Sequence, residues 1–353
     1  MKIVFSGGGT LGSVSPLIAI YQDLKKIQPA ADFLWLATRN GPEGQMIQSS
    51  QIQIKKIFAG KLRRYFNWQN FFDPIFVTFG LIQSIFILFK FKPDLVIVAG
   101  GFVGVPVVWA AWLLRRPILV HQQDVIVGLA NKLMAPFAKI ITVTFESSLK
   151  DFPPKKTKLI GNPVRAEVLS GNRENALNQF NLKNNLPTIL IIGGGTGALN
   201  LNQLVLDKIE ELVQFCQIIH LTGNKINKEF SHPNYHPYDF LHEELKDAYA
   251  ISDLAVSRGG MSVLTELAAN KLPVIIMPMA KSHQEANAQE FKRNNAALVI
   301  SENKINAEDF LEIVKKVLFD QNLLMNFSRN IGKMMINNAN QKMIDLLYEH
   351  AGK

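Results

Sequence analysis

Two glycine-rich segments of this chain have the residue types that bind a negatively charged group. GGGTLGS spans residues 7–13 and GGGTGAL spans residues 193–199, and each directly follows an apolar, β-branched run. Glycines after a strand let the backbone turn sharply and approach a ligand, while the N-terminus of the following helix favours negative charge. The first segment is not a P-loop, because it has no Gly-Lys-Ser/Thr. It is also a poor dinucleotide fingerprint, because the next strand, FLWLATRN, ends without an acidic residue for a ribose.

A third segment, SRGGMSVLTE at 257–266, places small residues at a strand end and then starts a helix. Such a helix N-terminus, carrying Ser262, can hold a diphosphate, and Glu266 is then placed to accept hydrogen bonds from ribose hydroxyls. The alternative for Glu266 is an ordinary solvated carboxylate on a helix surface. HQEANAQ at 283–289 follows the strand PVIIMP, and its amide and imidazole groups suit the hydroxyl and acetamido groups of a sugar.

The remaining charged residues indicate which groups would bind a diphosphate. Arg165, at the end of IGNPVR, is a natural phosphate partner across a cleft. No Asp-x-Asp pair occurs in the chain, which argues against a metal-chelated diphosphate. Helix dipoles and arginine would therefore stabilise the leaving group, and we expect neither a metal nor a cofactor. Together these features predict a nucleotide diphosphate held in a cleft between two domains.

The elements that must position these residues alternate between short apolar runs and helical patterns. Continuously apolar strands separated by helices indicate parallel sheets covered on both faces, that is, a doubly wound α/β fold. A chain of 353 residues suits two domains, and the repeated glycine loops predict two Rossmann-like halves. We expect domains at 1–162 and 163–335, divided at the break formed by Gly161, Asn162 and Pro163, and a final helix at 336–353 that packs back on the first domain.

The net charge of +9 suggests a negatively charged partner, unless it only serves solubility. No dense Lys/Arg run with interleaved aromatic residues is present, so we do not expect nucleic acid to be that partner. A single cysteine, Cys216, excludes an internal disulfide framework and a cysteine-built metal site. The N-terminal apolar stretch is too short for a secretory signal, so we expect a cytoplasmic protein.

The segment Phe71–Phe91 is rich in phenylalanine and follows a basic cluster that contains Lys61, Arg63 and Arg64. Its apolar core, Pro74–Phe89, falls short of the roughly 18–20 residues that span a bilayer, and Gln83 interrupts it. One interpretation is a crossover helix buried against the first sheet. The other is a face that lies on anionic lipid.

Seven segments, in order along nearly the whole chain, resemble the MurG family of glycosyltransferase family 28. The segments are GGGTLGSVSP (7–16), KPDLVIVAGGFVGVP (92–106), HQQDVIVGLANK (121–132), IGNPVR (160–165), GGGTGALNLN (193–202), SRGGMSVLTELA (257–268) and HQEANA (283–288). These bacterial enzymes add N-acetylglucosamine (GlcNAc) to lipid I to make lipid II. The resemblance implies two Rossmann-like domains in the GT-B arrangement, a UDP-GlcNAc donor, a polyprenyl-diphosphate-linked MurNAc-peptide acceptor, and a peripheral position at the cytoplasmic face of the membrane, on its anionic surface.

The resemblance also implies roles for individual residues. On the donor side, Leu241 would contact the uracil through its backbone, Glu266 the ribose, and Met261, Ser262 and Val263 the diphosphate. His283, Gln284 and Asn287 would face the GlcNAc, and Gly195, Thr196 and Arg165 would lie near the nucleotide. The acceptor-side residues would be Thr10, Leu11, Gly12, Ser13, Gln122 and Asn131.

The chain departs from the family pattern where the catalytic base is expected. The family loop usually reads Gly-Gly-Thr-Gly-Gly-His, so Leu11 replaces a glycine here and Ser13 replaces the histidine favoured as the base. The family sequence His-Glu-Gln-Asn is replaced by His121, Gln122, Gln123 and Asp124. Our hypothesis is that Asp124 takes over as the base, because the hydroxyl of Ser13, the other catalytic candidate, is a poor base at neutral pH. The alternative is that Asp124 caps the helix that begins near Gly128.

Two other functions stay open at this point. One is a GT-B transferase that uses a different acceptor. The other is a non-catalytic UDP-sugar-binding protein that has lost its base. Both would bind the nucleotide, and only acceptor-dependent release of UDP separates them from the transferase.

Overall fold

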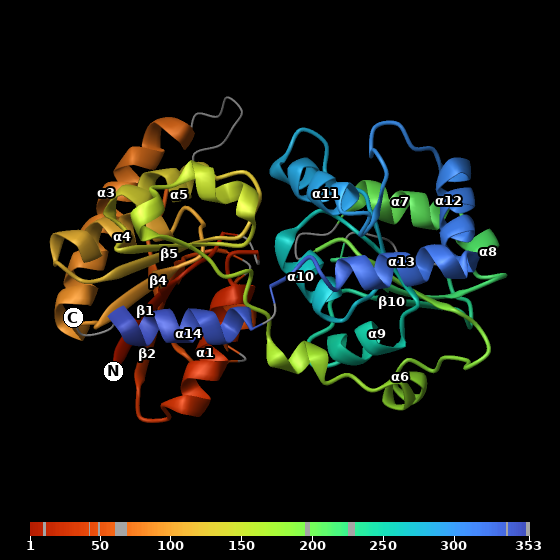
Figure 1. The fold of residues 1–353 in the computed structure, drawn as a ribbon, viewed down its shortest axis with the longest axis horizontal. Coiled ribbons are helices and arrows are strands. Elements are labelled where there is room, and N and C mark those ends of the chain that lie inside the picture. The colour runs from red at the N-terminus through yellow and green to blue at the C-terminus, as the bar shows by residue number, and fades with distance from the viewer. Residues whose placement is uncertain are drawn as a thin grey trace. The chain divides into compact units, whose positions relative to one another are not determined.

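The computed structural model describes residues 1–9, 12–41, 43–48, 50–60, 69–194, 198–224, 230–336 and 338–350, apart from the side chains of residues 45 and 69–72. It divides into two compact units (Figure 1). The first comprises residues 1–165 with residues 336–353, and the second comprises residues 166–335. The chain first passes between them at Arg165, three residues after the boundary that we expected from the sequence.

The first unit is built on a sheet in which all strand pairs are parallel. Its strands are β1 (Lys2–Ser6), β2 (Asp32–Thr38), β3 (Gln53–Ile57), β4 (Leu95–Val98), β5 (Ile118–Gln122), β6 (Ile140–Val143) and β7 (Thr157–Leu159). They lie in the order β3-β2-β1-β4-β5-β6-β7, with Ile3 in register with both Phe33 and Leu95. The order reverses between β1 and β4, and ligands of such sheets bind at this point, beyond the carboxyl ends of the strands.

Helices cover both faces of this sheet, as continuously apolar strands require. The helices are α1 (Ser15–Ile27), α2 (Glu43–Gln48), α3 (Gln69–Phe91), α4 (Gly104–Leu113), α5 (Leu129–Met134) and α14 (Ala339–His350), with 3-10 turns at Ala135–Phe137, Glu146–Asp151 and Pro154–Lys156. Ile3 and Phe5 belong to a core with α1 and α14, whereas Val4 belongs to a core with α3, α4 and α5. The final helix α14 packs against α1 through Met343, Ile344 and Leu347 (Figure 1).

Helix α3 presents different residues to the protein and to the solvent. Gly80, Ser84 and Leu88 are buried on the side that packs against α4, and a Cβ added at Gly80 would meet the carbonyl oxygen of Phe58. The opposite side exposes large apolar residues, which we call the apolar face: Ile75, Phe76, Phe79, Ile82, Phe86 and Phe89. Our expectation about length needs correction, because the 19 residues Asp73–Phe91 are, by length and composition alone, sufficient to cross a membrane.

The second unit repeats the architecture with a smaller parallel sheet. Its strands are β8 (Thr188–Ile192), β9 (Gln217–Leu221), β10 (Tyr235–Tyr238), β11 (Leu254–Ser257), β12 (Val274–Ile276) and β13 (Leu298–Val299). They lie in the order β10-β9-β8-β11-β12-β13. The helices are α6 (Arg173–Gln179), α7 (Leu199–Asp207), α8 (Ile209–Leu212), α9 (Leu245–Ile251), α10 (Met261–Ala269), α11 (His283–Arg293), α12 (Ala307–Phe319) and α13 (Gln321–Ile331), with a 3-10 turn at Ala166–Leu169. The predicted fold class, two doubly wound parallel-sheet domains, is confirmed.

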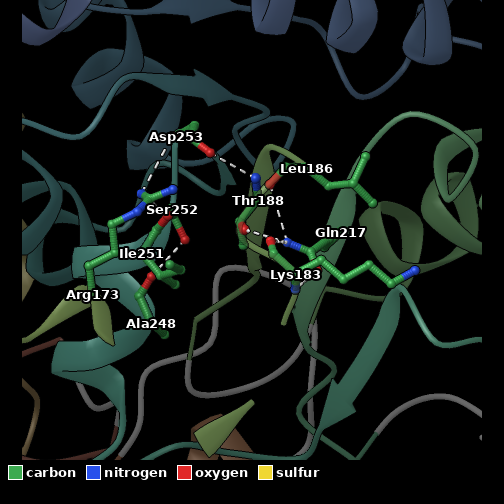
Figure 2. Close-up of polar contacts among 9 residues, drawn as sticks. All are labelled: Arg173, Lys183, Leu186, Thr188, Gln217, Ala248, Ile251, Ser252 and Asp253. Atoms are coloured by element: carbon green, nitrogen blue, oxygen red, sulfur yellow. Dashed lines mark hydrogen bonds and ion pairs between the residues drawn. The ribbon is translucent and has the colours of Figure 1, made fainter. Parts of the chain in front are cut away.

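The amino ends of the strands in the second unit are closed by polar side chains (Figure 2). Asp253 accepts a hydrogen bond from the backbone N–H of Thr188 (2.8 Å), and its other oxygen lies 3.8 Å from Nη1 of Arg173. The side-chain amide of Gln217 donates to the carbonyl oxygens of Lys183 and Leu186. These contacts join the segment before β8 to β9 and β11, so the loops that bear the sequence motifs lie at the other edge of the sheet.

Candidate functional site

In the first unit, the loops after β1 and β4 touch at the carboxyl edge of the sheet. Gly9, Gly100 and Gly101 have φ angles of +81°, +85° and +80°, in the left-handed region where glycine is favoured. A Cβ added at Gly101 would lie 2.7 Å from the carbonyl oxygen of Gly8 and 3.2 Å from Oγ of Ser13. Glycine is therefore required here by both backbone conformation and close approach.

Ser13 is buried in this contact, with only 3% of its surface exposed. Its Oγ accepts a hydrogen bond from the backbone N–H of Gly8 (3.1 Å). The hydroxyl of Ser13 therefore closes the glycine loop on itself, just before α1 begins at Ser15. Ser13 thus stabilises the conformation of this loop.

Glu43, the first residue of α2, contacts the first glycine loop through its side chain. The sequence analysis missed this residue. The side chain is 1% exposed, and Oε2 accepts from the N–H of Gly9 (3.1 Å) while Oε1 accepts from the N–H of Thr38 (2.9 Å) and from its hydroxyl. The first glycine loop thus already holds one carboxylate, supplied by the start of α2. No motif marks this residue, because its partners come from two other segments.

The loop after β5 is held by two amide side chains that we expected on the acceptor side. Gln122 donates through Nε2 to the carbonyl oxygens of Asp124 (2.7 Å) and Ile126 (3.2 Å). Its Oε1 accepts from Nδ2 of Asn131 (2.6 Å). Within the described residues, Oδ1 of Asn131 is buried without a hydrogen-bond partner, and a Cβ added at Gly100 would lie 3.6 Å from it. Gln122 and Asn131 are therefore brought together with the glycine loop after β4.

His121 begins the same motif and is fully enclosed. Its Nε2 lies 2.8 Å from Oδ1 of Asn162, and its Nδ1 lies 3.0 Å from Oγ1 of Thr142. An amide oxygen can only accept, so Nε2 carries the proton and Nδ1 accepts from the threonine hydroxyl. Burial lowers the pKa of His121 to about 4, although both hydrogen bonds oppose that shift. The side chain is thus neutral and connects β5 to the IGNPVR segment.

Asp124 follows these locked residues and is half-buried. The N-cap position of α5 belongs to Gly128, so the interpretation of Asp124 as the N-cap residue is wrong. Gly12 belongs to the same edge, while Thr10 and Leu11 lie outside the described residues.

In the second unit, the predicted diphosphate segment forms the start of α10. Gly260 is the N-cap residue, Met261 is buried, and Ser262 and Val263 are half-buried in the first turn. Glu266 is 4% exposed, and its Oε2 accepts a hydrogen bond from the hydroxyl of Tyr249 (2.8 Å). The alternative of a solvated helix carboxylate is therefore wrong, because α9 covers this side chain.

The motif HQEANA starts α11 and ties it to the loop before α10. Oε1 of Gln284 accepts from the N–H of Met279 (2.9 Å), and Nδ2 of Asn287 donates to the carbonyl oxygen of Gly259 (2.9 Å). Asn287 is fully buried, whereas His283 is half-buried at the first turn. Asn287 thus contributes by holding the two loops together, and His283 is the more accessible side chain.

A buried ion pair that the sequence analysis missed lies under these loops. Nη1 of Arg258 is 2.9 Å from Oε1 of Glu302, and the two side chains are 10% and 7% exposed. Arg258 could have been noticed in the sequence, because it is the second residue of SRGG. Its partner Glu302 lies beyond β13, in a polar turn that no motif marks.

The other predicted donor residues have separate positions. Leu241 lies in the loop between β10 and α9. Arg165 is half-buried and is the last residue before the chain passes into the second unit. Gly195 and Thr196 lie outside the described residues. Within the part of the chain that the structure describes, no group of three or more His, Cys, Asp or Glu side chains could hold a metal ion.

Comparison with known proteins agrees with this arrangement. Residues 3–143 match the glycosyltransferase family 28 N-terminal domain, and residues 188–344 match the family 28 C-terminal domain. A relative from Clostridium botulinum (strain Kyoto / Type A2) is 34% identical over 356 residues, covering 99% of each chain. A relative from Bacillus thuringiensis (strain Al Hakam) is 38% identical over 323 residues, covering 90% of this chain and 91% of the relative. Both are named as UDP-N-acetylglucosamine–N-acetylmuramyl-(pentapeptide) pyrophosphoryl-undecaprenol N-acetylglucosamine transferases.

Solved structures show the same fold at lower identity. MurG from Acinetobacter baumannii superposes with a TM-score of 0.73 at 22% identity over 99% of both chains. A glycosyltransferase of kitacinnamycin reaches a TM-score of 0.76 at 11% identity, over 99% of this chain and 98% of that one. With both domain models matched and near full-length relatives above 30% identity, the chain belongs to glycosyltransferase family 28.

Proposed function

We propose that this chain is an inverting glycosyltransferase that moves GlcNAc from UDP-GlcNAc to the 4-hydroxyl of MurNAc in lipid I, forming lipid II for peptidoglycan synthesis. The observation that carries the proposal is the relative that bears this name and aligns over 99% of the chain. The segments that the alignment covers include the α10 and α11 motifs, whose side chains converge at one edge of the second sheet.

The second unit is proposed to hold the donor. The start of α10, at Met261, Ser262 and Val263, offers backbone N–H groups and a helix dipole to the diphosphate. The carboxylate of Glu266, oriented by Tyr249, accepts from the ribose, and the backbone of Leu241 contacts the uracil. His283 and Gln284 face the sugar, while Gly195, Thr196 and Arg165 lie near the nucleotide.

The first unit is proposed to hold the acceptor. Its diphosphate binds the backbone of the loops after β1 and β4. Ser13 closes the first loop, which contains Gly12, and Asn131 lies beside the second at Gly100. Thr10, Leu11 and Gln122 complete this side. The acceptor's 4-hydroxyl attacks the anomeric carbon of GlcNAc. A bond forms between that oxygen and the carbon, the carbon–oxygen bond to the diphosphate breaks, and UDP leaves with the electron pair.

The hydroxyl proton needs an acceptor, and Asp124 is the proposed base. His121 is unsuited, because both ring nitrogens are engaged and its pKa is lowered to about 4. Ser13 is unsuited, because a hydroxyl is a poor base at neutral pH and this one serves the glycine loop. No metal or cofactor is part of the proposal: the helix dipole and arginine stabilise the leaving UDP.

The apolar face of α3 is proposed to lie on the anionic cytoplasmic surface of the membrane and to hold the protein there peripherally. Phe79 and Phe86 are 52% and 70% exposed on this face, and Lys90 and Lys92 are exposed at the end of the same helix. An apolar surface bordered by cations is the composition that interfacial helices use. The opposite side of α3 is packed against α4, which favours a helix lying on the membrane over one crossing it.

The experiment that tests the proposed function is release of UDP from UDP-GlcNAc by the purified protein, with and without a lipid I analogue. Release that depends on the analogue is the expected result. Binding of UDP without such release would contradict the proposal and support a different acceptor or a non-catalytic UDP-sugar-binding protein.

A further inference from the structure

One carboxylate, Glu302, connects the loops that carry the donor residues of the second unit. Its Oε1 accepts from Nη1 of Arg258 (2.9 Å) and from Nδ2 of Asn200 (2.9 Å). Its Oε2 accepts from the backbone N–H of Ala280 (3.0 Å). Glu302 itself stands just after β13, so all its partners are distant in the sequence.

Each partner belongs to a different segment at the carboxyl edge of the sheet. Arg258 stands between β11 and the N-cap of α10, where the donor diphosphate is proposed to bind. Ala280 lies between β12 and α11, in the loop that leads to His283 and Gln284. Asn200 lies in the first turn of α7, directly after the second glycine loop.

The charges of this pair are withdrawn from solvent. Among the lysine and arginine residues that the structure describes, only Arg258 is buried, with 8% of its surface exposed. A buried ion pair is weak evidence for stability, because desolvation offsets the attraction between the charges. A positional role explains this pair better. A carboxylate that accepts hydrogen bonds from three donors fixes the positions of all three donor groups.

We propose that Glu302 is a positioning residue for the donor site, which it organises through Arg258, Asn200 and Ala280. The inference rests on the proposed function, because it assigns the donor's diphosphate and sugar to these loops. Glu302 does not touch the substrate. It sets the distance between the start of α10 and the loop before α11, and misplacement of such groups by about 1 Å can lower the rate about 100-fold.

The test compares Glu302→Gln with a matched control, Asp253→Asn, in the full-length protein. Both changes turn a carboxylate into an amide in the same unit, but Asp253 lies at the amino edge of the sheet (Figure 2). The glutamine can still accept from Arg258 through its oxygen, but its amino group faces the N–H of Ala280. We expect Glu302→Gln to weaken UDP binding about tenfold, the effect of losing a buried hydrogen bond to a charged group.

Three readouts separate positioning from stability. Calorimetric UDP affinity and the KM for UDP-GlcNAc should worsen in Glu302→Gln, whereas the KM for the acceptor should stay at the wild-type value. Asp253→Asn should lower Tm and leave the UDP affinity unchanged. In the double variant Arg258→Met/Glu302→Leu, an apolar pair should restore much of the Tm lost in Glu302→Gln but not the UDP affinity.

Wild-type affinity for UDP in Glu302→Gln, or affinity restored by the apolar pair, would overturn the inference and leave the proposed function standing. A wild-type protein without affinity for UDP would overturn both.

Discussion

Asp124 lies in the loop after β5, where several polar side chains have structural roles. Gln122 and Asn131 hold the loop after β5, and His121 is locked against Asn162 and Thr142. Asp124 is half-buried and is not the N-cap residue of α5. The proposal that it is the base rests on its being the carboxylate of this motif.

If Asp124 is the base, Asp124→Asn should lower kcat about 10²–10⁴-fold, the usual contribution of a positioned base. Asparagine keeps the shape of the side chain but cannot take the proton. The measurement is the steady-state rate with both substrates saturating, together with the KM for UDP-GlcNAc, which we expect to be unchanged.

Ser13→Ala serves as the control. It removes the acceptor for the N–H of Gly8, so it should raise the KM for the acceptor more than it lowers kcat. Equal turnover in Asp124→Asn and wild type would assign the base elsewhere.

At this scale, the sequence revealed residues that stand inside motifs and missed their distant partners. Gln284 and Asn287 were predicted from the sequence because they share a short segment with His283. Glu43 was missed because its contact with Gly9 spans 34 residues. Glu302 was missed for the same reason, and Arg258 was quoted within its motif without a role. Side-chain pairing across loops depends on the folded sheet, which local residue patterns do not specify.

Helix α3 is the element with two opposed surfaces, and its apolar face makes a separate prediction. Replacing Phe79 and Phe86 together by aspartate should weaken binding to vesicles that contain phosphatidylglycerol at least about tenfold, because each buried phenylalanine contributes about 1.5–3 kcal/mol. Flotation or sedimentation of the protein with vesicles measures this. Turnover of a soluble, short-chain acceptor analogue should not change, because neither side chain belongs to the proposed site.

The matched control is Ile27→Asp at the end of α1, which is 52% exposed in the same unit but lies outside the apolar face. It should bind vesicles as the wild type does. Unchanged vesicle binding in the double phenylalanine variant would remove the apolar face from the proposal.

Elements with strong apolar patterns were predictable, and polar elements at the sheet edges were not. The apolar run LVIV, for example, forms the buried parallel strand β4, whereas the longer apolar segments of α3 and α4 form helices. The strands β3 (QIKKI), β7 (TKL) and β10 (YHPY) have no such run, and all three end their sheets. Each of these three has one neighbour and partly exposed side chains, so it does not need the continuous apolar run of a central strand. The extent of α3 was also underestimated, because its first turns extend beyond the apolar run.

At the scale of the whole molecule, each unit has a fully buried histidine on a strand of its sheet, His121 on β5 and His220 on β9. Burial lowers the pKa of His121 in the first unit to about 4 and that of His220 in the second unit to about 3. His220 is held between the hydroxyl of Tyr235 and Oδ1 of Asn202 (3.0 Å each). Both side chains are neutral in the folded protein and become protonated near pH 6.5 in the unfolded chain.

This difference makes stability depend on pH in a defined direction. Between pH 6.5 and about 4 the unfolded chain binds more protons than the folded one, so the free energy of unfolding falls as the pH is lowered. Above pH 6.5 the contribution is fully present. Lowering the pH from 7 to 5 should therefore cost about 2 kcal/mol for each histidine.

The two units can be followed separately, because all four tryptophans precede residue 113 and so belong to the first unit. Urea unfolding followed by tryptophan fluorescence at pH 7 and pH 5 should show the loss due to His121. In His121→Asn the protein should be less stable at pH 7, because the ring contacts are gone. The difference in the free energy of unfolding between pH 7 and pH 5 should shrink by about 2 kcal/mol.

His220→Asn is the control. It should leave the fluorescence transition unchanged and alter only the circular-dichroism transition of the second unit. An equal pH dependence in His121→Asn and wild type would show that the pKa of His121 in the folded protein is close to its unfolded value of about 6.5. The part of the argument against His121 as the catalytic base that rests on its lowered pKa would then fail.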